Sequence, residues 1–166
     1  LSGARSVFLD AAARALDALD VMRLTEGAHI VRDFEKRLAR LEEQREKVKQ
    51  HAPQIAADYR AHLTAVLAEF RAVMPDETRI MQEAALYADR VNVTEELVRL
   101  ASHFAQFRTI LAEEEPVGRR LDFLLQEINR ETNTIGSKVN SAAVQQVVVA
   151  MKNEVEKLRE QVQNLE

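Results

Sequence analysis

The chain has 166 residues, of which 46% are hydrophobic, 30% charged and only 5% aromatic, and its net charge is −4. The absence of cysteine excludes disulfides and thiolate metal sites, and the acidic charge argues against a uniformly basic nucleic-acid-binding domain. Only four glycines and three prolines interrupt a composition rich in helix formers, which predicts an all-α fold. With no apolar run of membrane-spanning length and no leader sequence, a cytoplasmic protein without membrane partners is expected.

The first half of the chain predicts a long antiparallel helical hairpin over residues 1–75. Nothing stops a helix over about 5–51 except Gly27, which costs roughly 1 kcal/mol inside a helix. Pro53 suits the first turn of a second helix, which runs to about residue 73. The short connection between the two makes them antiparallel neighbours.

Residues 76–166 predict a C-terminal domain of shorter helices. Asp76 is a candidate N-cap for the first, either Asn92 or Thr94 for the second, and Ser141 for the last, while Gly136 is a plausible terminator of the helix that starts at Pro116. The last helix carries a heptad pattern at Val144, Val148, Met151, Val155, Leu158, Val162 and Leu165. Such a seam needs a partner helix, from this chain or from another subunit, so an oligomer-forming protein is expected.

The helix over 119–138 has two polar faces rather than one. At 3.6 residues per turn, one apolar stripe comprises Leu121, Leu124, Leu125, Ile128, Thr132 and Ile135. A second face carries Arg119, Asp122, Gln126, Asn129, Arg130 and Asn133, and a third carries Arg120, Glu127, Glu131 and Lys138. Bulky Phe123 lies between the polar strips. This mixture predicts polar groups with assigned partners, as in a site or a specific interface.

Candidate metal ligands occur on two neighbouring helices. Glu96, Arg99 and His103 share one face of the helix over 94–114, and imidazole and carboxylates are suitable ligands for a divalent transition metal. Alternatively, Glu96 and Arg99 form a helix salt bridge and His103 is an ordinary satisfied residue. On the next helix Glu127 and Glu131, at i and i+4, could jointly hold a cation, although such pairs are common and no Glu-x-x-His motif is present.

Asp122 could add a carboxylate to that site from the neighbouring strip. It points to the opposite side of the helix from Glu131, so one metal is not expected to use both, and Asp122 is better suited to orienting an arginine or serving a neighbouring subunit. A phosphate-binding patch is predicted from Arg99, Arg119, Arg120, Arg130 and Lys138. The alternative role for these cations is ion pairing with the acidic residues nearby.

Four long segments of the chain are distinctive. They read EPVGRRLDFLLQEINRETNTIGSK, preceded by NVTEELVRLASHFAQF and followed by EKLREQVQNLE, with ALDVMRLTEGAHIVRDFEKRL upstream. Together these segments resemble the C-terminal region of the YicC family of bacterial proteins. The resemblance implies a stress-induced, metal-dependent endoribonuclease that forms a homo-oligomer, with a hexamer expected. It also implies an N-terminal α/β domain that this chain lacks.

The resemblance therefore implies cleavage of single-stranded RNA assisted by Mn²⁺ or Mg²⁺, with no small-molecule cofactor. Within its motifs, residue chemistry suggests metal ligation by Glu96, His103, Glu127 and Glu131, and catalytic roles for His103, Glu127, Glu131 and Asp122. The other hypothesis is non-enzymatic: an oligomeric helical scaffold, or an RNA- or protein-binding stress-response factor, whose polar strips are buried networks between helices.

Overall fold

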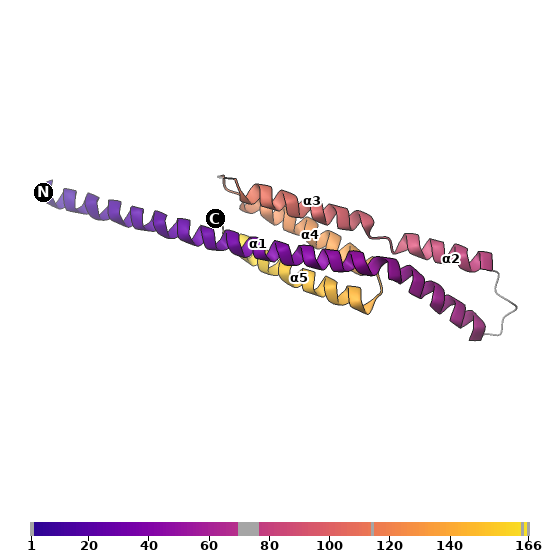
Figure 1. Ribbon diagram of the computed structural model, residues 1–166. Coiled ribbons are helices and arrows are strands. Elements are labelled where there is room, and N and C mark those ends of the chain that lie inside the picture. Colours follow the sequence, from indigo (N-terminus) through magenta and orange to yellow (C-terminus); the bar gives the residue numbers. More distant parts are fainter. Residues whose placement is uncertain (1, 70–76, 114, 164, 166) are drawn as a thin grey trace. The chain divides into compact units, whose positions relative to one another are not determined.

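A computed structural model describes all residues except 1, 70–76, 114, 164 and 166. The described residues form α-helices and no strands: α1 (Ser2–Glu69), α2 (Glu77–Arg90), α3 (Thr94–Leu111), α4 (Gly118–Lys138) and α5 (Ala142–Val162) (Figure 1). The all-α fold predicted from the sequence is confirmed. Among the described helices, none combines the length and the apolar character needed to cross a membrane.

The chain divides into two compact units, residues 1–36 and 37–166, with the boundary inside α1. In the first unit many large apolar side chains face solvent, among them Val7, Phe8, Leu16 and Leu24, which are 62–76% exposed. The sequence-based division at residue 75 remains a prediction.

The helix break predicted at Pro53 is wrong, because α1 continues through this residue to Glu69. An internal proline removes one backbone hydrogen bond and clashes with the preceding turn, which usually bends a helix without ending it when the flanking residues favour helix. The chain reverses instead after residue 69, and α2 runs back along the C-terminal third of α1 (Figure 1). Tyr59 of α1 stacks on Tyr87 of α2, with ring centroids 3.8 Å apart. The hairpin exists, but α2 supplies its second arm.

The core of the second unit is built around α4, which packs on α3 through one face and on α5 through another. The apolar stripe predicted for this helix is buried, with Leu121, Ile128 and Ile135 each 0% exposed. Six of the seven predicted heptad positions of α5 are buried as well, from Val144 to Val162. Their partner helix α4 belongs to the same chain.

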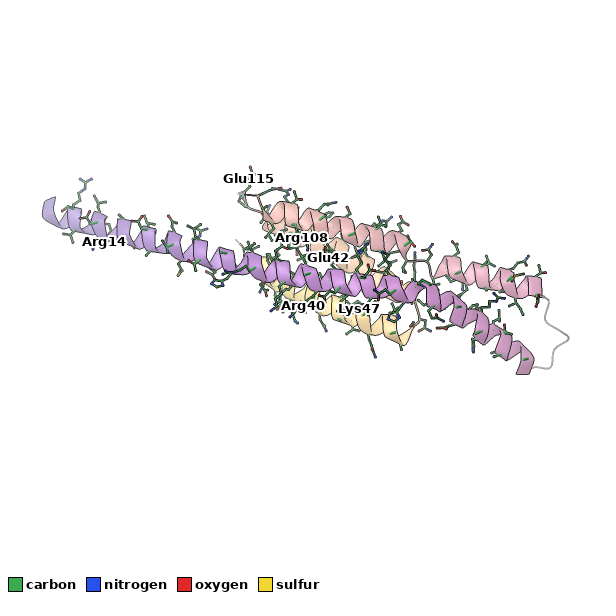
Figure 2. All side chains as sticks on the ribbon, in the orientation of Figure 1. Arg14, Arg40, Glu42, Lys47, Arg108 and Glu115 are labelled. Carbon is green, nitrogen blue, oxygen red and sulfur yellow. The ribbon has the colours of Figure 1, made fainter. Side chains whose placement is uncertain are left out.

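The part of α1 after Arg37 is joined to this core by charged side chains. Arg108 of α3 donates to both carboxylate oxygens of Glu42, at 2.7 and 3.1 Å (Figure 2). Arg45, at a position where the sequence pattern expects an apolar residue, donates to the backbone carbonyl of Leu97 at 2.7 Å. Glu154 of α5 accepts from Arg37 at 3.1 Å. These bonds fix α1 against both α3 and α5.

One predicted helix end is wrong. Gly136 does not terminate α4, which continues to Lys138; an added Cβ at Gly136 would lie 3.1 Å from a methyl carbon of Val148, so this glycine permits close approach of α5. Gln145 of α5 donates to the carbonyls of Gly136 and Val139, satisfying the end of α4. At the start of α3, the side chain of Asn92 accepts the backbone N–H of Thr94, whereas the predicted cap Asp76 lies outside the described residues.

Candidate functional site

His103, Glu127 and Glu131 meet at the interface between α3 and α4. One ligand atom from each residue lies within 4.8 Å of those of the other two. The two carboxylates stand one turn apart on α4, so they share a face, and the tight connection after α3 folds α4 back onto it. We call these three residues the carboxylate–histidine cluster.

The cluster has the chemistry of a divalent cation site. Glu131 is buried, at 3% exposed, and the Nδ1 atom of His103 is buried with no hydrogen-bond partner among the described residues. Leaving a buried polar atom unsatisfied is costly, so a bound cation would stabilise this nitrogen. One imidazole nitrogen and two carboxylates form a donor set suited to ions such as Mn²⁺. The residues present therefore fit the metal that the family resemblance implies.

Arg99 lies beside the cluster and partly balances its charge. Its guanidinium donates to Glu131 at 3.4 Å and also pairs with Glu95. The charge of Glu95, together with the hydrogen bond to Glu131, raises the pKa of Arg99 above its ordinary value. Arg130, one helical turn on from Glu127, approaches that carboxylate to 3.5 Å while its side chain remains 69% exposed. Two of the predicted phosphate-binding arginines thus border the cluster.

The other predicted cations lie further along the helices. Arg120 forms a two-bond ion pair with Glu113, and this hydrogen bonding raises the pKa of Arg120. Arg119 is exposed and lines a surface hollow of about 320 Å³ at the start of α4. Lys138, at the other end of the helix, pairs with Glu96. The predicted cations are therefore spread over the length of α4, with Arg99 on α3 beside its middle, and do not form one patch.

Glu96 is buried but stands outside the cluster, contrary to its prediction as a metal ligand beside His103. One oxygen pairs with Lys138 at 2.7 Å, and Lys138 also donates to the carbonyl of Asn92 at 3.0 Å. The second oxygen of Glu96 is buried and has no hydrogen-bond partner in the described part of the chain. Two turns of α3 separate Glu96 from His103, so a shared helix face does not bring their side chains to the same point.

Asp122 also stands outside the cluster. It accepts from Gln126 at 2.8 Å and lies 3.6 Å from Arg159 of α5. It occupies the side of α4 that faces α5, whereas Glu127 and Glu131 face α3. The structure thus places Asp122 next to an arginine and away from the three-residue cluster.

Sequence reasoning did not single out the polar residues of α5 that face α4. Lys152, Asn153 and Arg159 line a hollow together with the amides of α4. In the sequence, Lys152 and Arg159 flank the apolar positions of the heptad pattern. The spacing of Lys152 and Arg159 by seven residues, which places them on one face, was the available signal.

Comparison with known proteins gives one family. Residues 48–166 match a family model described as "Endoribonuclease YicC-like, C-terminal". The chain is 40% identical over 154 residues to a protein named "Probable endoribonuclease YicC" from Clostridioides difficile (strain 630), an alignment that covers 92% of this chain and 53% of that protein. A protein of the same name from Haemophilus influenzae is 37% identical over 145 residues, covering 87% and 50% respectively. The chain spans about half the length of these curated relatives.

Proposed function

Because the chain belongs to the YicC-like endoribonuclease family through its C-terminal region, we propose that it supplies the metal-binding part of an enzyme that cleaves single-stranded RNA. The convergence of His103, Glu127 and Glu131 on one point supports this proposal most directly. Two relatives are named as probable endoribonucleases, and these names support RNA cleavage as the reaction. RNA is accordingly the proposed substrate, with Mn²⁺ or Mg²⁺ as the cofactor.

Glu127, Glu131 and His103 would hold the ion. When bound, it would polarise a scissile phosphate and lower the pKa of a water molecule. His103 is the group in the cluster able to exchange a proton during bond cleavage, through whichever ring nitrogen faces the substrate. Arg99 and Arg130 are placed beside the carboxylates, where their planar guanidinium groups can bind phosphate oxygens and offset charge in the transition state.

We also propose that the full-length protein works as a homo-oligomer, with a hexamer expected, in the cytoplasm. Large apolar side chains of residues 5–31 are exposed in the single chain. A helix that is apolar on several sides is usually buried in an assembly, so these side chains support contact with another subunit or domain.

The deciding experiment incubates full-length protein with labelled single-stranded RNA and either Mn²⁺ or EDTA. Cleavage should require the metal and fall at least about a hundredfold in His103→Ala, Glu127→Gln and Glu131→Gln. Mn²⁺ affinity, measured by calorimetry, should fall in the same variants. Glu83→Gln, an exposed change on α2, is the matched control.

Oligomer mass, measured for each variant, separates the enzyme from the scaffold hypothesis. Lost cleavage at unchanged mass supports a catalytic cluster. If the wild type does not cleave RNA and the variants only dissociate, the results would instead support a non-enzymatic scaffold.

A further inference from the structure

A polar hollow separates the outer edges of α4 and α5, on a different side of α4 from the carboxylate–histidine cluster. Its volume is about 380 Å³, within the range of small-ligand sites. Its polar lining comprises the amides of Gln126, Asn129, Asn133 and Asn153, the cations Lys152 and Arg159, and the carboxylate of Glu156. We call it the amide hollow.

The three asparagines of the amide hollow lie on the exposed surfaces of their helices, Asn129 and Asn133 on α4 and Asn153 on α5. In the part of the chain that the structure describes, none of these three side chains makes a hydrogen bond. Asparagine is also a poor residue for the middle of a helix. Water satisfies these exposed amides in the free chain, so a ligand can bind them without breaking an internal hydrogen bond.

The lining of the amide hollow matches the chemistry of a nucleobase. Leu125 and Val155 form the floor of the hollow but are only 1% and 4% exposed, so the polar side chains around them supply most of the surface that a base would contact. The amides around this floor present donors and acceptors together, and asparagine can bond two atoms of one base edge. Lys152 can bind a flanking phosphate, and Arg159, which also lies 3.6 Å from Asp122, borders the same surface. A protein partner would favour a larger apolar centre than these two residues supply.

The position of the amide hollow relates it to the cluster. Around α4 the two are separated by roughly 145°, from 3.6 residues per turn. Arg130 and Phe123 lie on the arc between them, and Phe123 is exposed by 60%. A single strand crossing α4 would therefore meet a cation and an aromatic ring on its way from the hollow to the carboxylates.

We propose that the amide hollow is a base-binding subsite, which holds one nucleotide of single-stranded RNA at a distance from the bond that is cut. This rests on the proposed function for the identity of the ligand. It adds a recognition site formed by Asn129, Asn133 and Asn153, away from the metal ligands.

The test measures binding of a fluorescent single-stranded RNA to full-length protein in EDTA, so that metal-dependent cleavage plays no part. The double variant Asn129→Ala/Asn133→Ala should bind about tenfold or more weakly, since a bidentate amide–base contact accounts for that much. Its melting temperature should be unchanged or higher, because alanine favours helix. Asn140→Ala, an exposed asparagine between α4 and α5 that does not line the hollow, should bind as the wild type does.

An oligonucleotide with abasic positions distinguishes a base from a phosphate as the group bound. The wild type should lose about tenfold in affinity when one particular base is removed, and the double variant should show no such loss. Equal binding by variant and wild type would overturn the subsite, as would equal losses for base-containing and fully abasic strands. A change in oligomer mass in the double variant would likewise overturn it, in favour of an interface between copies. Loss of RNA cleavage in the cluster variants, by contrast, bears only on the proposed function.

Discussion

The guanidinium of Arg99 lies 3.4 Å from the carboxylate of Glu131, a buried group that also belongs to the carboxylate–histidine cluster. A cation bound to the cluster and the side chain of Arg99 would therefore share one carboxylate. The cation and the guanidinium would repel each other. When no metal is bound, Arg99 compensates the buried negative charge of Glu131.

Replacing Arg99 with glutamine should have opposite effects on the free protein and on metal binding. The melting temperature of the metal-free protein should fall, because Glu131 loses a partner. Mn²⁺ should bind roughly fivefold more tightly, because one repelling charge is removed. Thermal melts in EDTA and calorimetric titration with Mn²⁺ measure both effects. The exposed Arg90→Gln change on α2 is the control; Arg99→Gln with unchanged or weaker Mn²⁺ binding would contradict a cation site at the cluster.

Gly136→Ala should destabilise the chain by about 1 kcal/mol, since overpacking outweighs the gain in helix propensity. The added Cβ would lie 3.1 Å from a methyl carbon of Val148, whose branched side chain is buried and stiff. Chemical denaturation measures the change. Gly27→Ala is a matched control, because nothing lies within 4 Å of its added Cβ, and it should stabilise by about 1 kcal/mol. Adding Val148→Ala to Gly136→Ala should remove the part of the loss that comes from the clash.

Glu154 should contribute to the dependence of stability on pH. Burial raises the pKa of its carboxyl, but hydrogen bonds and charges from Lys157 and Arg37 outweigh that effect and lower it below its ordinary value of 4.5. A lowered folded-state pKa gives stability that is present above the unfolded-state pKa and is lost as the pH falls through the folded-state value.

At pH 7, Glu154→Gln should therefore be less stable than the wild type by about 1 kcal/mol. The difference should shrink as the pH falls below 4.5. Urea denaturation at a series of pH values measures it, with the exposed Glu83→Gln as the reference. A stability difference that stays constant down to acid pH would show that Glu154 does not stabilise the fold through its charge.

Pro53→Ala should stabilise α1 by about 1–3 kcal/mol, because it restores a backbone hydrogen bond and removes a clash. Denaturation and helical circular dichroism measure the change, with the exposed Gln50→Ala as a control expected within about 0.5 kcal/mol. A loss of stability would mean that the bend is needed to align α1 with α2, for example for the Tyr59–Tyr87 stack.

The sequence predicted the fold class because composition and hydrophobic periodicity report directly on helices. The buried stripe of α4 and the seam of α5 follow from the same periodicity. The predictions at Pro53 and Gly136 failed for a different reason: both residues are statistical helix breakers, yet tertiary packing decides whether a helix continues. Gly136 is needed for its missing side chain, a requirement that appears only once Val148 is known to lie against it.

At the candidate site, the sequence identified the residue types better than their grouping. Periodicity placed Glu127 and Glu131 on one face of α4 and separated Asp122 from them. Periodicity does not determine which turn of α3 lies opposite these carboxylates, so it does not distinguish Glu96 from His103 as the third ligand. Only the packing of α3 on α4 brings His103 to the carboxylates and pairs Glu96 with Lys138. The lack of partners for the asparagines is likewise a property of the folded chain.

The ion pairs that fasten α1 join residues far apart in sequence: 66 positions separate Glu42 from Arg108, and 117 separate Arg37 from Glu154. Helices α3, α4 and α5 are instead linked by short connections, so bringing them together costs little loop-closure entropy. Contacts of low sequence separation form fastest, and we expect these three helices to assemble before α1 docks. All three residues of the cluster, and the whole amide hollow, lie in this early-forming segment, so newly made chains would gain their polar surfaces before the long helix is in place.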